Sequence, residues 1–305
     1  MPFSAIYTKP KEPAQTILQV LRRTNNFTPP SHPRTNHGNP LPSRFLPLTH
    51  NSEVLGYIDR ERVLPHILSD DSDRIFTVSP DESFISFSSH INSIQERGTA
   101  LETLLQTWRS RDVFPCLRGW REERFPVYVT TSKSKTEGFL SFERSAVGLF
   151  GFPCYGTHLN LFISAPQSTP LSDLHRATKM WIARRSKTKQ TYPGFLDNCV
   201  GGGLSLYSTP WKTLRKECEE EAGLPPHLVA QARSVGAITY FLDHPVRGLV
   251  NGTEFCFDLD LARTGEHSWT PTAADGEVDE FMLMDIVEVR VLSLPLSKFA
   301  TLMHI

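Results

Sequence analysis

The chain has 305 residues, 39% of them hydrophobic, and a formal net charge of −1. This length suffices for two domains with buried cores, and the balanced charge gives no reason to expect a nucleic-acid partner. The sequence has no apolar run of about 18 residues and no apolar signal-peptide core, so we expect no membrane partner and a cytoplasmic location, with mitochondrial import as the alternative because residues 1–50 are basic.

The cysteines also indicate an intracellular protein. There are five of them, an odd number, they are widely spaced, and no two form a CxxC pair. This pattern favours reduced thiols in an intracellular protein over a disulfide framework or a zinc site. Cys218 occupies an apolar position of a helical pattern, so we interpret it as a core residue and not as a nucleophile.

The first half of the chain reads as a small α+β domain that ends near residue 148, so the two domains are expected at 1–148 and 149–305. Residues 16–27 are predicted to form a helix of this domain, and the Pro-rich stretch 28–48 is predicted to be an extended loop. Leu101, Leu104, Leu105 and Trp108 recur at helical spacing. The further elements expected are a strand and helix at 54–68, a strand at 83–88, a helix at 97–110 and paired strands at 126–130 and 138–143.

The second half alternates strands with helices, which is typical of an α/β fold. A glycine-rich turn at 201–203 leads into a helix predicted at 209–222, with Thr209 as N-cap and Gly223 as a left-handed C-cap. The strands expected are 158–164, 179–183, 234–243 and 253–260, followed by a loop, a strand and the start of a helix in DGEVDEFMLMDIVEV from residue 275.

The helix after the glycines carries Glu217, Glu220 and Glu221. Positions i, i+3 and i+4 share one helix face, so we expect the three carboxylates to converge. Converging carboxylates repel each other unless a cation joins them. The alternative from these residues alone is a solvated acidic face.

The spacing around this helix resembles the Nudix box, whose pattern is a glycine, five residues, a glutamate, seven residues and the run R-E-U-x-E-E-x-G-U, with U aliphatic. Gly202, Glu217, Glu220, Glu221, Gly223 and Leu224 match it. Ser208 stands where the pattern has its first glutamate, and Lys216 stands where it has arginine. Lysine cannot reproduce the forked geometry of a guanidinium, so we expect a less organised site that keeps its activity.

The resemblance extends beyond the box. Residues 142–160, 181–205 and 275–284 are similar to the Nudix branch related to the domain fused to fungal thiamine pyrophosphokinases, and residues 16–27 and 55–68 are similar to the domain that precedes it in that branch. The resemblance implies a Nudix α/β/α sandwich around a mixed sheet. It also implies a magnesium- or manganese-dependent hydrolase that cuts thiamine diphosphate, or its damaged oxo and oxy analogues, to the monophosphate and phosphate.

The resemblance also implies roles for individual residues. Glu217, Glu220 and Glu221 would bind the metal, and Glu277 or Glu280 would be a fourth ligand or the general base. The predicted substrate-binding residues are the cations Arg184, Arg185 and Lys187, the glycines Gly202 and Gly203, and the aromatic residues Phe152 and Tyr155.

Each of these roles has a structural alternative. Glu277 and Glu280 would otherwise belong to a charged loop, the three cations to a solvated turn, and each aromatic ring to the core. Two other functions remain open, namely hydrolysis of a nucleotide or another diphosphate, and binding of a diphosphate without hydrolysis. The sequence leaves the oligomeric state undetermined.

Overall fold

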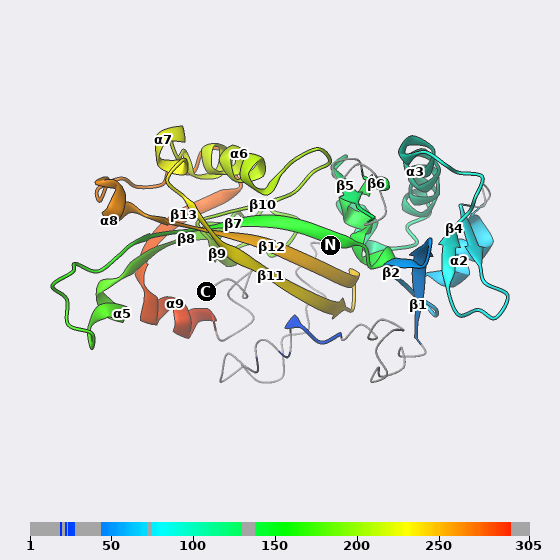
Figure 1. Cartoon of the computed structure of the whole chain (residues 1–305), viewed down its shortest axis with the longest axis horizontal. Coiled ribbons are helices and arrows are strands. Elements are labelled where there is room, and N and C mark those ends of the chain that lie inside the picture. The colour runs from blue at the N-terminus through cyan, green and yellow to red at the C-terminus, as the bar shows by residue number, and fades with distance from the viewer. Residues whose placement is uncertain are drawn as a thin grey trace.

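The computed structural model describes residues 19, 22, 24–27, 44–71, 75–129 and 138–293. Two groups of strands and helices follow one another along the chain, and in Figure 1 they lie side by side along the long axis of the molecule. The first group is built from residues up to Phe152, and the second is built around one long mixed sheet.

The first domain contains a four-stranded sheet in the order β2-β1-β4-β3, in which β1 and β4 run parallel, and a separate two-stranded sheet of β5 and β6. Its elements are β1 (Phe45–His50), β2 (Glu53–Asp59), α2 (Leu64–Asp70), β3 (Phe76–Val78), β4 (Ile85–Phe87), α3 (Ile94–Ser110), η2 (Pro115–Gly119), β5 (Arg124–Val127), β6 (Leu140–Glu143), η3 (Arg144–Ala146) and α4 (Val147–Phe150).

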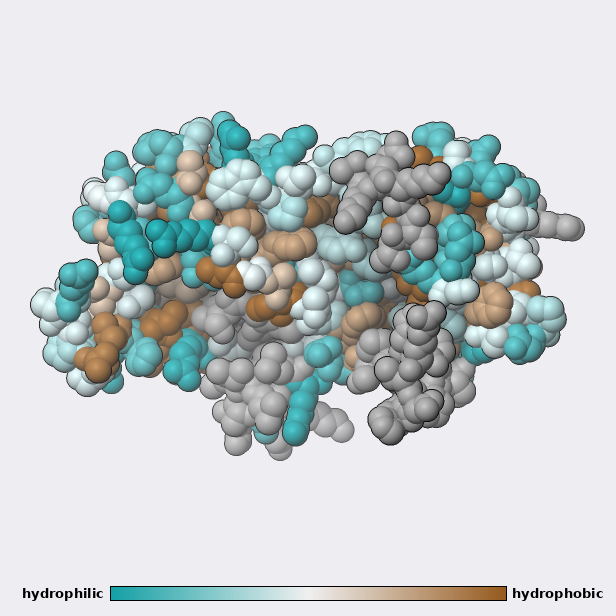
Figure 2. All heavy atoms as spheres, in the orientation of Figure 1, coloured by the Kyte–Doolittle hydropathy of each residue, from teal (hydrophilic) through white to brown (hydrophobic). Residues whose placement is uncertain are grey.

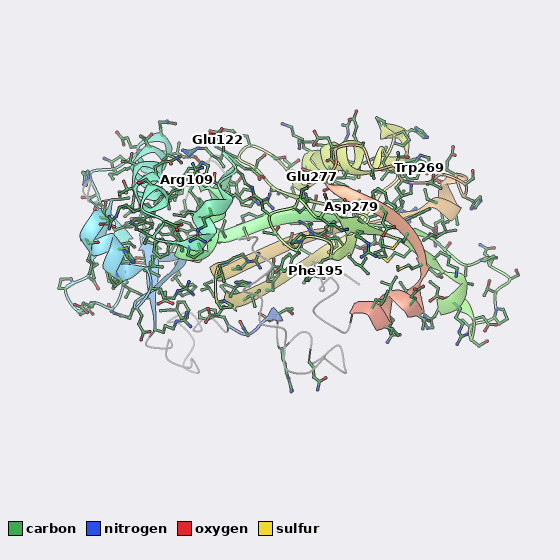
Figure 3. All side chains as sticks on the ribbon, turned by 180° about the vertical axis from the view of Figure 1, so that it is seen from behind. Arg109, Glu122, Phe195, Trp269, Glu277 and Asp279 are labelled. Atoms are coloured by element: carbon green, nitrogen blue, oxygen red, sulfur yellow. The ribbon has the colours of Figure 1, made fainter. Side chains whose placement is uncertain are left out.

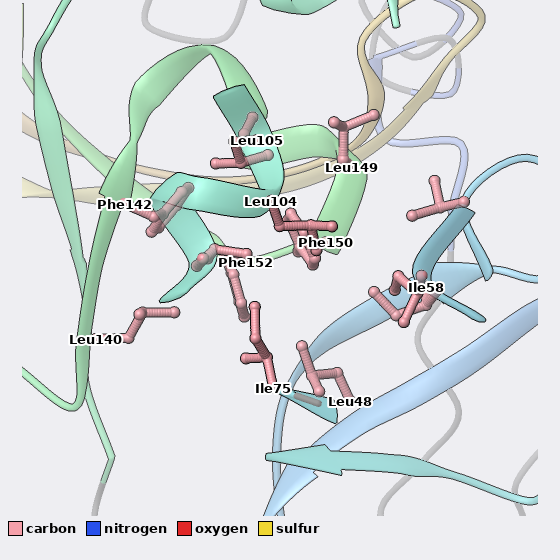
Figure 4. Close-up of a cluster of buried hydrophobic side chains, with 14 of the residues drawn as sticks. Leu48, Ile58, Ile75, Leu104, Leu105, Leu140, Phe142, Leu149, Phe150 and Phe152 are labelled. Atoms are coloured by element: carbon pink, nitrogen blue, oxygen red, sulfur yellow. The ribbon is translucent and has the colours of Figure 1, made fainter. Parts of the chain in front are cut away.

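Helix α3 is held at its start by a reciprocal cap. The Ser93 side chain accepts a hydrogen bond from Glu96 N, and the Glu96 carboxylate accepts one from Ser93 N, so two free amide groups of the first turn are satisfied. The predicted face of Leu101, Leu104, Leu105 and Trp108 is buried in the first core. Figure 4 shows Leu104 and Leu105 in that core, close to Phe142, Phe150 and Phe152.

The second domain is a seven-stranded mixed sheet. Its main path is β11-β12-β7-β8-β13, with β10 paired to β7 and β9 paired to β8. Its elements are β7 (Pro153–Ile163), α5 (Leu174–Ala177), β8 (Lys179–Arg185), β9 (Leu196–Asn198), β10 (Val200–Gly203), α6 (Pro210–Ala222), α7 (Pro226–Val229), β11 (Arg233–His244), β12 (Gly248–Asp260), α8 (Leu261–Thr264), β13 (Val278–Asp285) and α9 (Ile286–Ser293).

Helices cover both faces of this sheet. One face packs Leu159 of β7 and Phe257 of β12 against Leu214 of α6, and the other packs Ile182 of β8 against Val289 of α9. Figure 1 shows α6 and α7 on one side of the strands and α9 on the other. The predicted α/β/α sandwich around a mixed sheet is therefore confirmed.

The chain passes from one core to the other at Phe152 and Pro153. Phe150 and Phe152 lie in the first core with their rings stacked 5.3 Å apart, whereas Pro153 begins β7 of the second sheet. This transition lies four residues after the predicted end of the first domain at 148, because both aromatic side chains pack backward into the first core.

Most predicted elements are present, with two corrections. Residues 45–48 belong to strand β1 and not to a loop, since Phe45, Leu46 and Leu48 are buried despite the neighbouring prolines. The glycine run is strand β10, paired with β7 from Val200 to Gly203, and not a turn. Most of the helix predicted at 16–27 and residues 28–43 of the predicted loop lie outside the described residues.

None of the helices in the described part of the chain has the length and apolar character needed to cross a membrane. Figure 2 shows a mostly hydrophilic surface over α6 and α7, with hydrophobic residues scattered singly or in small groups elsewhere on the same face. Isolated exposed hydrophobic residues are normal for a protein surface.

Candidate active site

Helix α6 begins and ends where its sequence predicts. The Thr209 hydroxyl accepts a hydrogen bond from Lys212 N at 3.2 Å, and Gly223 has the left-handed φ of 65° that ends the helix. Leu214 and Cys218 point into the core beneath the helix. Cys218 is therefore a core residue, as predicted, and its thiol has a pKa well above the ordinary value because of burial.

Glu217 lies directly against strand β10. A Cβ on Gly202 would overlap Cγ of Glu217 and come within 2.5 Å of its Cδ. Glycine at position 202 is thus what allows the carboxylate to rest on the strand backbone. Burial raises the pKa of Glu217, because a charged carboxylate loses water there.

Glu221, one turn further along α6, is more deeply buried, with 5% of its surface exposed. Its Oε2 accepts a hydrogen bond from Gly201 N at 3.0 Å, and its Oε1 lies 4.0 Å from Nζ of Lys189. Burial is the main cause that raises the pKa of Glu221 to about 7; the nearby charge of Glu217 acts in the same direction, and the hydrogen bond from Gly201 N and the charge of Lys189 oppose it. The partly buried Glu217 and the buried Glu221 therefore face the glycine strand, and burial disfavours the charged form of each.

Glu220 does not join them. Its side chain is 48% exposed, and its Oε2 accepts a 2.7 Å ion pair from Lys216, which also lies 3.4 Å from Glu217 Oε1. Among the described residues, no three His, Cys, Asp or Glu side chains are gathered closely enough to hold a metal ion. The expected convergence of all three glutamates on one point is therefore not present among the described residues, where Lys216 pairs with both Glu217 and Glu220 and Lys189 pairs with Glu221. The role of the three glutamates as metal ligands stays a prediction.

Lys189 links Glu277, which directly precedes β13, to the site. Its ammonium group forms ion pairs with both Glu277 and Glu221. Figure 3 shows Glu277 at the start of β13, on the side where α6 lies. Lys189 thus pairs with Glu221 and Glu277, which are 56 positions apart in the chain, while Lys216 pairs with Glu217.

The donor set suits a hard divalent cation. Magnesium and manganese prefer carboxylate oxygens, and Glu217 and Glu221 are carboxylates whose burial makes a neutralising charge favourable. The ammonium groups of Lys189 and Lys216 provide that charge in this structure. These side chains therefore fit a metal that would hold the oxygens of a diphosphate and acidify a bound water.

The structure does not bring Glu280 and Arg184 to these carboxylates. Arg184 Nε donates a 2.5 Å hydrogen bond to Glu280 Oε1, and Arg184 Nη2 also contacts Sδ of Met282. Met282 packs against the cluster that contains Val289 of α9, on the face opposite α6. Glu280 and Arg184 thus form a cross-strand ion pair away from Glu217.

Arg185 has a different environment. Its Nη1 forms a 2.8 Å ion pair with Asp197, and its Nε donates a hydrogen bond to the carbonyl of Thr191. Its charge lowers the pKa of Lys189, which places it close to the Glu221 side of the site. Lys187 makes no contact that links it to these groups within the described residues.

The two predicted aromatic residues also separate. Phe152 is completely buried in the first core, between Phe142 and Phe150, so its ring is occupied by core packing. Tyr155 is partly exposed on β7, its carbonyl accepts a hydrogen bond from Leu204 N after the glycine strand, and its ring centroid lies 6.1 Å from that of Tyr128. Tyr155 therefore borders the glycine strand.

Several residues near the site lacked a sequence signal that identified them. Lys189 stands in a basic run with no special spacing, and Tyr128 and Glu123 lie in the first domain, although Glu123 is close enough to raise the pKa of Glu217. Ser208 and Thr213 share a 2.7 Å hydroxyl hydrogen bond at the start of α6. A search for residues close in sequence to the box cannot find Tyr128 and Glu123, because they lie in the first domain.

Comparison with protein families gives the class of protein. Residues 171–302 match the model of the NUDIX domain, and residues 16–153 match a model described as a domain of unknown function, DUF4743. Residues 171–302 are therefore similar to a Nudix domain, and the residues before them are similar to the second family, which agrees with the resemblance to the Nudix box and with the two-part fold.

Individual relatives are consistent with this architecture. The chain is 31% identical over 256 residues to Nudix hydrolase 24, chloroplastic, and 30% identical over 263 residues to Nudix hydrolase 20, chloroplastic, both from Arabidopsis thaliana. In each case the match covers 84% of this chain and 64% of the relative, so the chain spans less than two thirds of the plant proteins' length. The cytoplasmic location of this chain stays a prediction.

The fold is similar to that of a solved structure of DR0079 from Deinococcus radiodurans. The match covers 45% of this chain and 72% of DR0079, with 18% identity and a TM-score of 0.32.

Proposed function

We propose that this protein is a metal-dependent pyrophosphohydrolase whose site is built around Glu217 and Glu221. The observation that carries the proposal is the position of the partly buried Glu217 and the buried Glu221 against the backbone of Gly202 and Gly201, where a close contact and a hydrogen bond hold them. A metal that assists phosphoryl transfer requires carboxylate ligands held in fixed positions, and these carboxylates gain from a cation that neutralises their charge.

Water would attack the terminal phosphorus while the bridging oxygen leaves with the monophosphate, so one diphosphate and one water give a monophosphate and inorganic phosphate. A bound Mg²⁺ or Mn²⁺ would neutralise charge on the phosphate oxygens and lower the pKa of the attacking water. Glu217 and Glu221 would hold that metal. Glu277 would act as a further metal ligand or as the general base after its ion pair with Lys189 breaks. Glu220 would become a ligand after its ion pair with Lys216 breaks.

We propose thiamine diphosphate, and particularly its oxo and oxy analogues, as the substrates, on the resemblance of several long segments to the thiamine pyrophosphokinase-related branch. A flat heterocycle needs an aromatic surface on which to stack. Tyr155 and Tyr128 supply two such rings beside the glycine strand, one from each domain.

The test is a substrate panel. The full chain with Mg²⁺ is incubated with thiamine diphosphate, its oxidised analogues, dinucleotides and nucleoside triphosphates, and both phosphate and monophosphate are quantified. We expect equal amounts of the two products and the highest kcat/KM for the thiamine analogues. Faster turnover of a nucleotide would replace the substrate assignment, and tight binding with no phosphate release would make the protein a diphosphate-binding module.

Two variants of one helix decide whether the activity belongs to this site. Glu217→Gln removes a buried charge beside Gly202, and we expect turnover to fall by roughly a hundredfold or more. Glu219→Gln changes an exposed neighbour of the same residue type and should leave turnover unchanged. Equal activity in both variants would assign the hydrolysis to another site or to a contaminant.

A further inference from the structure

The first domain contacts the Nudix domain through two hydrogen bonds near the acidic site. In one, the carbonyl of Arg124 in β5 accepts a hydrogen bond from Leu206 N in the loop between β10 and α6. In the other, Nε of Arg121 donates a 2.9 Å hydrogen bond to Oε1 of Gln190, next to Lys189. Figure 3 labels Glu122, the neighbour of Arg121, on the part of the first domain that adjoins the Nudix domain.

Arg144 lies beside the glycine strand. A Cβ on Gly203 would be 3.5 Å from the guanidinium carbon of Arg144 and 2.6 Å from Cζ of Phe125. Gly203 follows Gly202, on which Glu217 rests. The same guanidinium lies 5.1 Å from the centre of the Phe125 ring and forms a 2.8 Å ion pair with Glu123. Phe125 and Glu123 thus orient Arg144, and both are residues of the first domain.

Arg121 carries a charge with no carboxylate at ion-pair distance among the described residues. Its hydrogen-bond partner in that part of the chain is the neutral side chain of Gln190. The side chain is partly buried. Burial, together with the positive charges of Arg144 and Arg185, lowers the pKa of Arg121 to about 10, although Glu123 and Glu143 act in the opposite direction. A guanidinium in this setting gains by meeting an anion.

Four cations therefore approach one another around the site. Arg144, Arg185 and Lys189 each form an ion pair, with Glu123, with Asp197 and with the Glu221–Glu277 pair respectively. Among the described residues, no carboxylate lies at ion-pair distance from the Arg121 guanidinium, although Glu123 and Glu143 act on it from farther away. Burial lowers the pKa of Lys189, and the charges of Arg185, Arg144 and Arg121 lower it further. Such mutual repulsion is relieved by an additional anion.

We propose that the first domain supplies part of the diphosphate-binding site, with the guanidinium groups of Arg121 and Arg144 holding phosphate oxygens of the substrate across from Glu217 and Glu221. Guanidinium groups match phosphate geometry through paired N–H donors. Arg144 lies beside Gly203, and Arg121 is bonded to Gln190, the chain neighbour of Lys189, so both guanidinium groups approach the part of the structure that holds the carboxylates. The site is then a composite of two domains, and a Nudix domain alone would lack both arginines.

This inference rests on the proposed function for the identity of the ligand, and inorganic pyrophosphate with Mg²⁺ tests it without requiring turnover. The dissociation constant is measured by calorimetry on the full chain for the wild type, Arg121→Gln, Arg144→Gln and Arg118→Gln. Arg118 is a matched control because it is an exposed arginine near Arg121 that pairs with Asp112. We expect Arg121→Gln and Arg144→Gln to weaken binding about tenfold or more, and Arg118→Gln to change it by less than about twofold.

Folding effects are separated by charge-retaining and pair-removing variants. Arg144→Lys keeps the charge and should recover part of the affinity, while Glu123→Gln combined with Arg144→Gln removes the ion pair without leaving a lone carboxylate and should still bind weakly. Wild-type affinity in Arg121→Gln and in the Glu123, Arg144 double variant overturns the inference, as does a wild type that does not bind pyrophosphate.

The same variants separate this inference from the proposed hydrolase activity. A wild type that hydrolyses the substrate panel while the arginine variants keep their KM refutes the two-domain site and leaves the hydrolase intact. A wild type that binds pyrophosphate through both arginines but releases no phosphate from any substrate supports the two-domain site and refutes hydrolysis.

Discussion

The carboxylate of Glu217 rests on the backbone of Gly202 so closely that no side chain fits between them. We therefore expect Gly202→Ala to push α6 away from β10 and to lower kcat/KM on the order of a hundredfold, since small displacements of reacting groups carry penalties of that size. Steady-state kinetics on the preferred diphosphate measures the change. Ser205→Ala, an exposed position in the following loop, is the control. Full activity in Gly202→Ala would mean that the contact is not needed for catalysis.

Glu221→Gln tests the more deeply buried carboxylate. Glutamine keeps an oxygen that can accept the hydrogen bond from Gly201 N, so the fold should survive, while the charge needed to hold a cation is lost. We expect a higher Mg²⁺ concentration for half-maximal activity and turnover reduced by roughly a hundredfold. A magnesium titration of this variant beside Glu219→Gln measures both effects. An unchanged titration curve would exclude Glu221 as a ligand.

Phe152 and Tyr155 are expected to respond differently to truncation. Phe152→Ala empties a fully buried site and should reduce the free energy of unfolding by about 3–5 kcal/mol. Tyr155→Ala removes a partly exposed ring beside the glycine strand and should raise KM for the thiamine analogues with a small effect on stability. Chemical denaturation and KM measurements on both variants make the comparison. A raised KM in folded Phe152→Ala, with none in Tyr155→Ala, would reverse these assignments.

Lys216 contacts both Glu217 and Glu220, so it takes up the position of a supporting cation although the Nudix box has arginine there. Arginine at this position could bond both carboxylates through its fork, and a glutamate at 208 would restore the missing acid before the helix start. We predict that Ser208→Glu combined with Lys216→Arg raises kcat several-fold above the wild type. Turnover numbers of the single and double variants test this, and equal values for all would mean that the pair has no supporting role here.

The cysteines should be unreactive in the folded protein. Burial raises the pKa of Cys116 and of Cys154 to about 12, which keeps both thiols protonated and poorly nucleophilic near neutral pH. A thiol reagent at about pH 8 should label these two residues slowly in the native state, and all five cysteines rapidly after unfolding. Mass spectrometry counts the labels. Rapid labelling of Cys116 in the native protein would contradict its buried position.

The raised pKa of the buried thiols also makes the stability of the fold depend on pH. A thiol whose pKa is raised in the folded state stabilises the fold fully below the unfolded value of 9.0, and this contribution is lost as the pH rises toward about 12. Denaturation midpoints should therefore fall over that alkaline range. A midpoint that is constant up to about pH 11 would argue against the buried thiols as titrating groups.

Local sequence signals predicted much of the fold correctly. Helix α6 begins at Thr209 and ends at Gly223 because an N-cap hydroxyl and a left-handed glycine act within one turn of the chain. The apolar spacing of α3 likewise predicted its buried face. Residues 45–48 and the glycine run were the exceptions. The strand conformation of the glycine run depends on pairing with β7, which is about 40 positions earlier in the chain.

The box spacing by itself determined that Glu217 and Glu221 share a helix face, since that follows from the α-helical repeat. Only the tertiary structure decided which acidic residues meet there. Glu277 arrives through the pairing of β13 with β8 and through Lys189, whereas Glu280 is turned to the opposite face with Arg184. Arg144 lies beside Gly203 of the glycine strand, and Arg121 is bonded to Gln190, although both arginines belong to another domain. Side chains that act together across domains are positioned by packing between separate cores, and spacing along the chain carries no record of that packing.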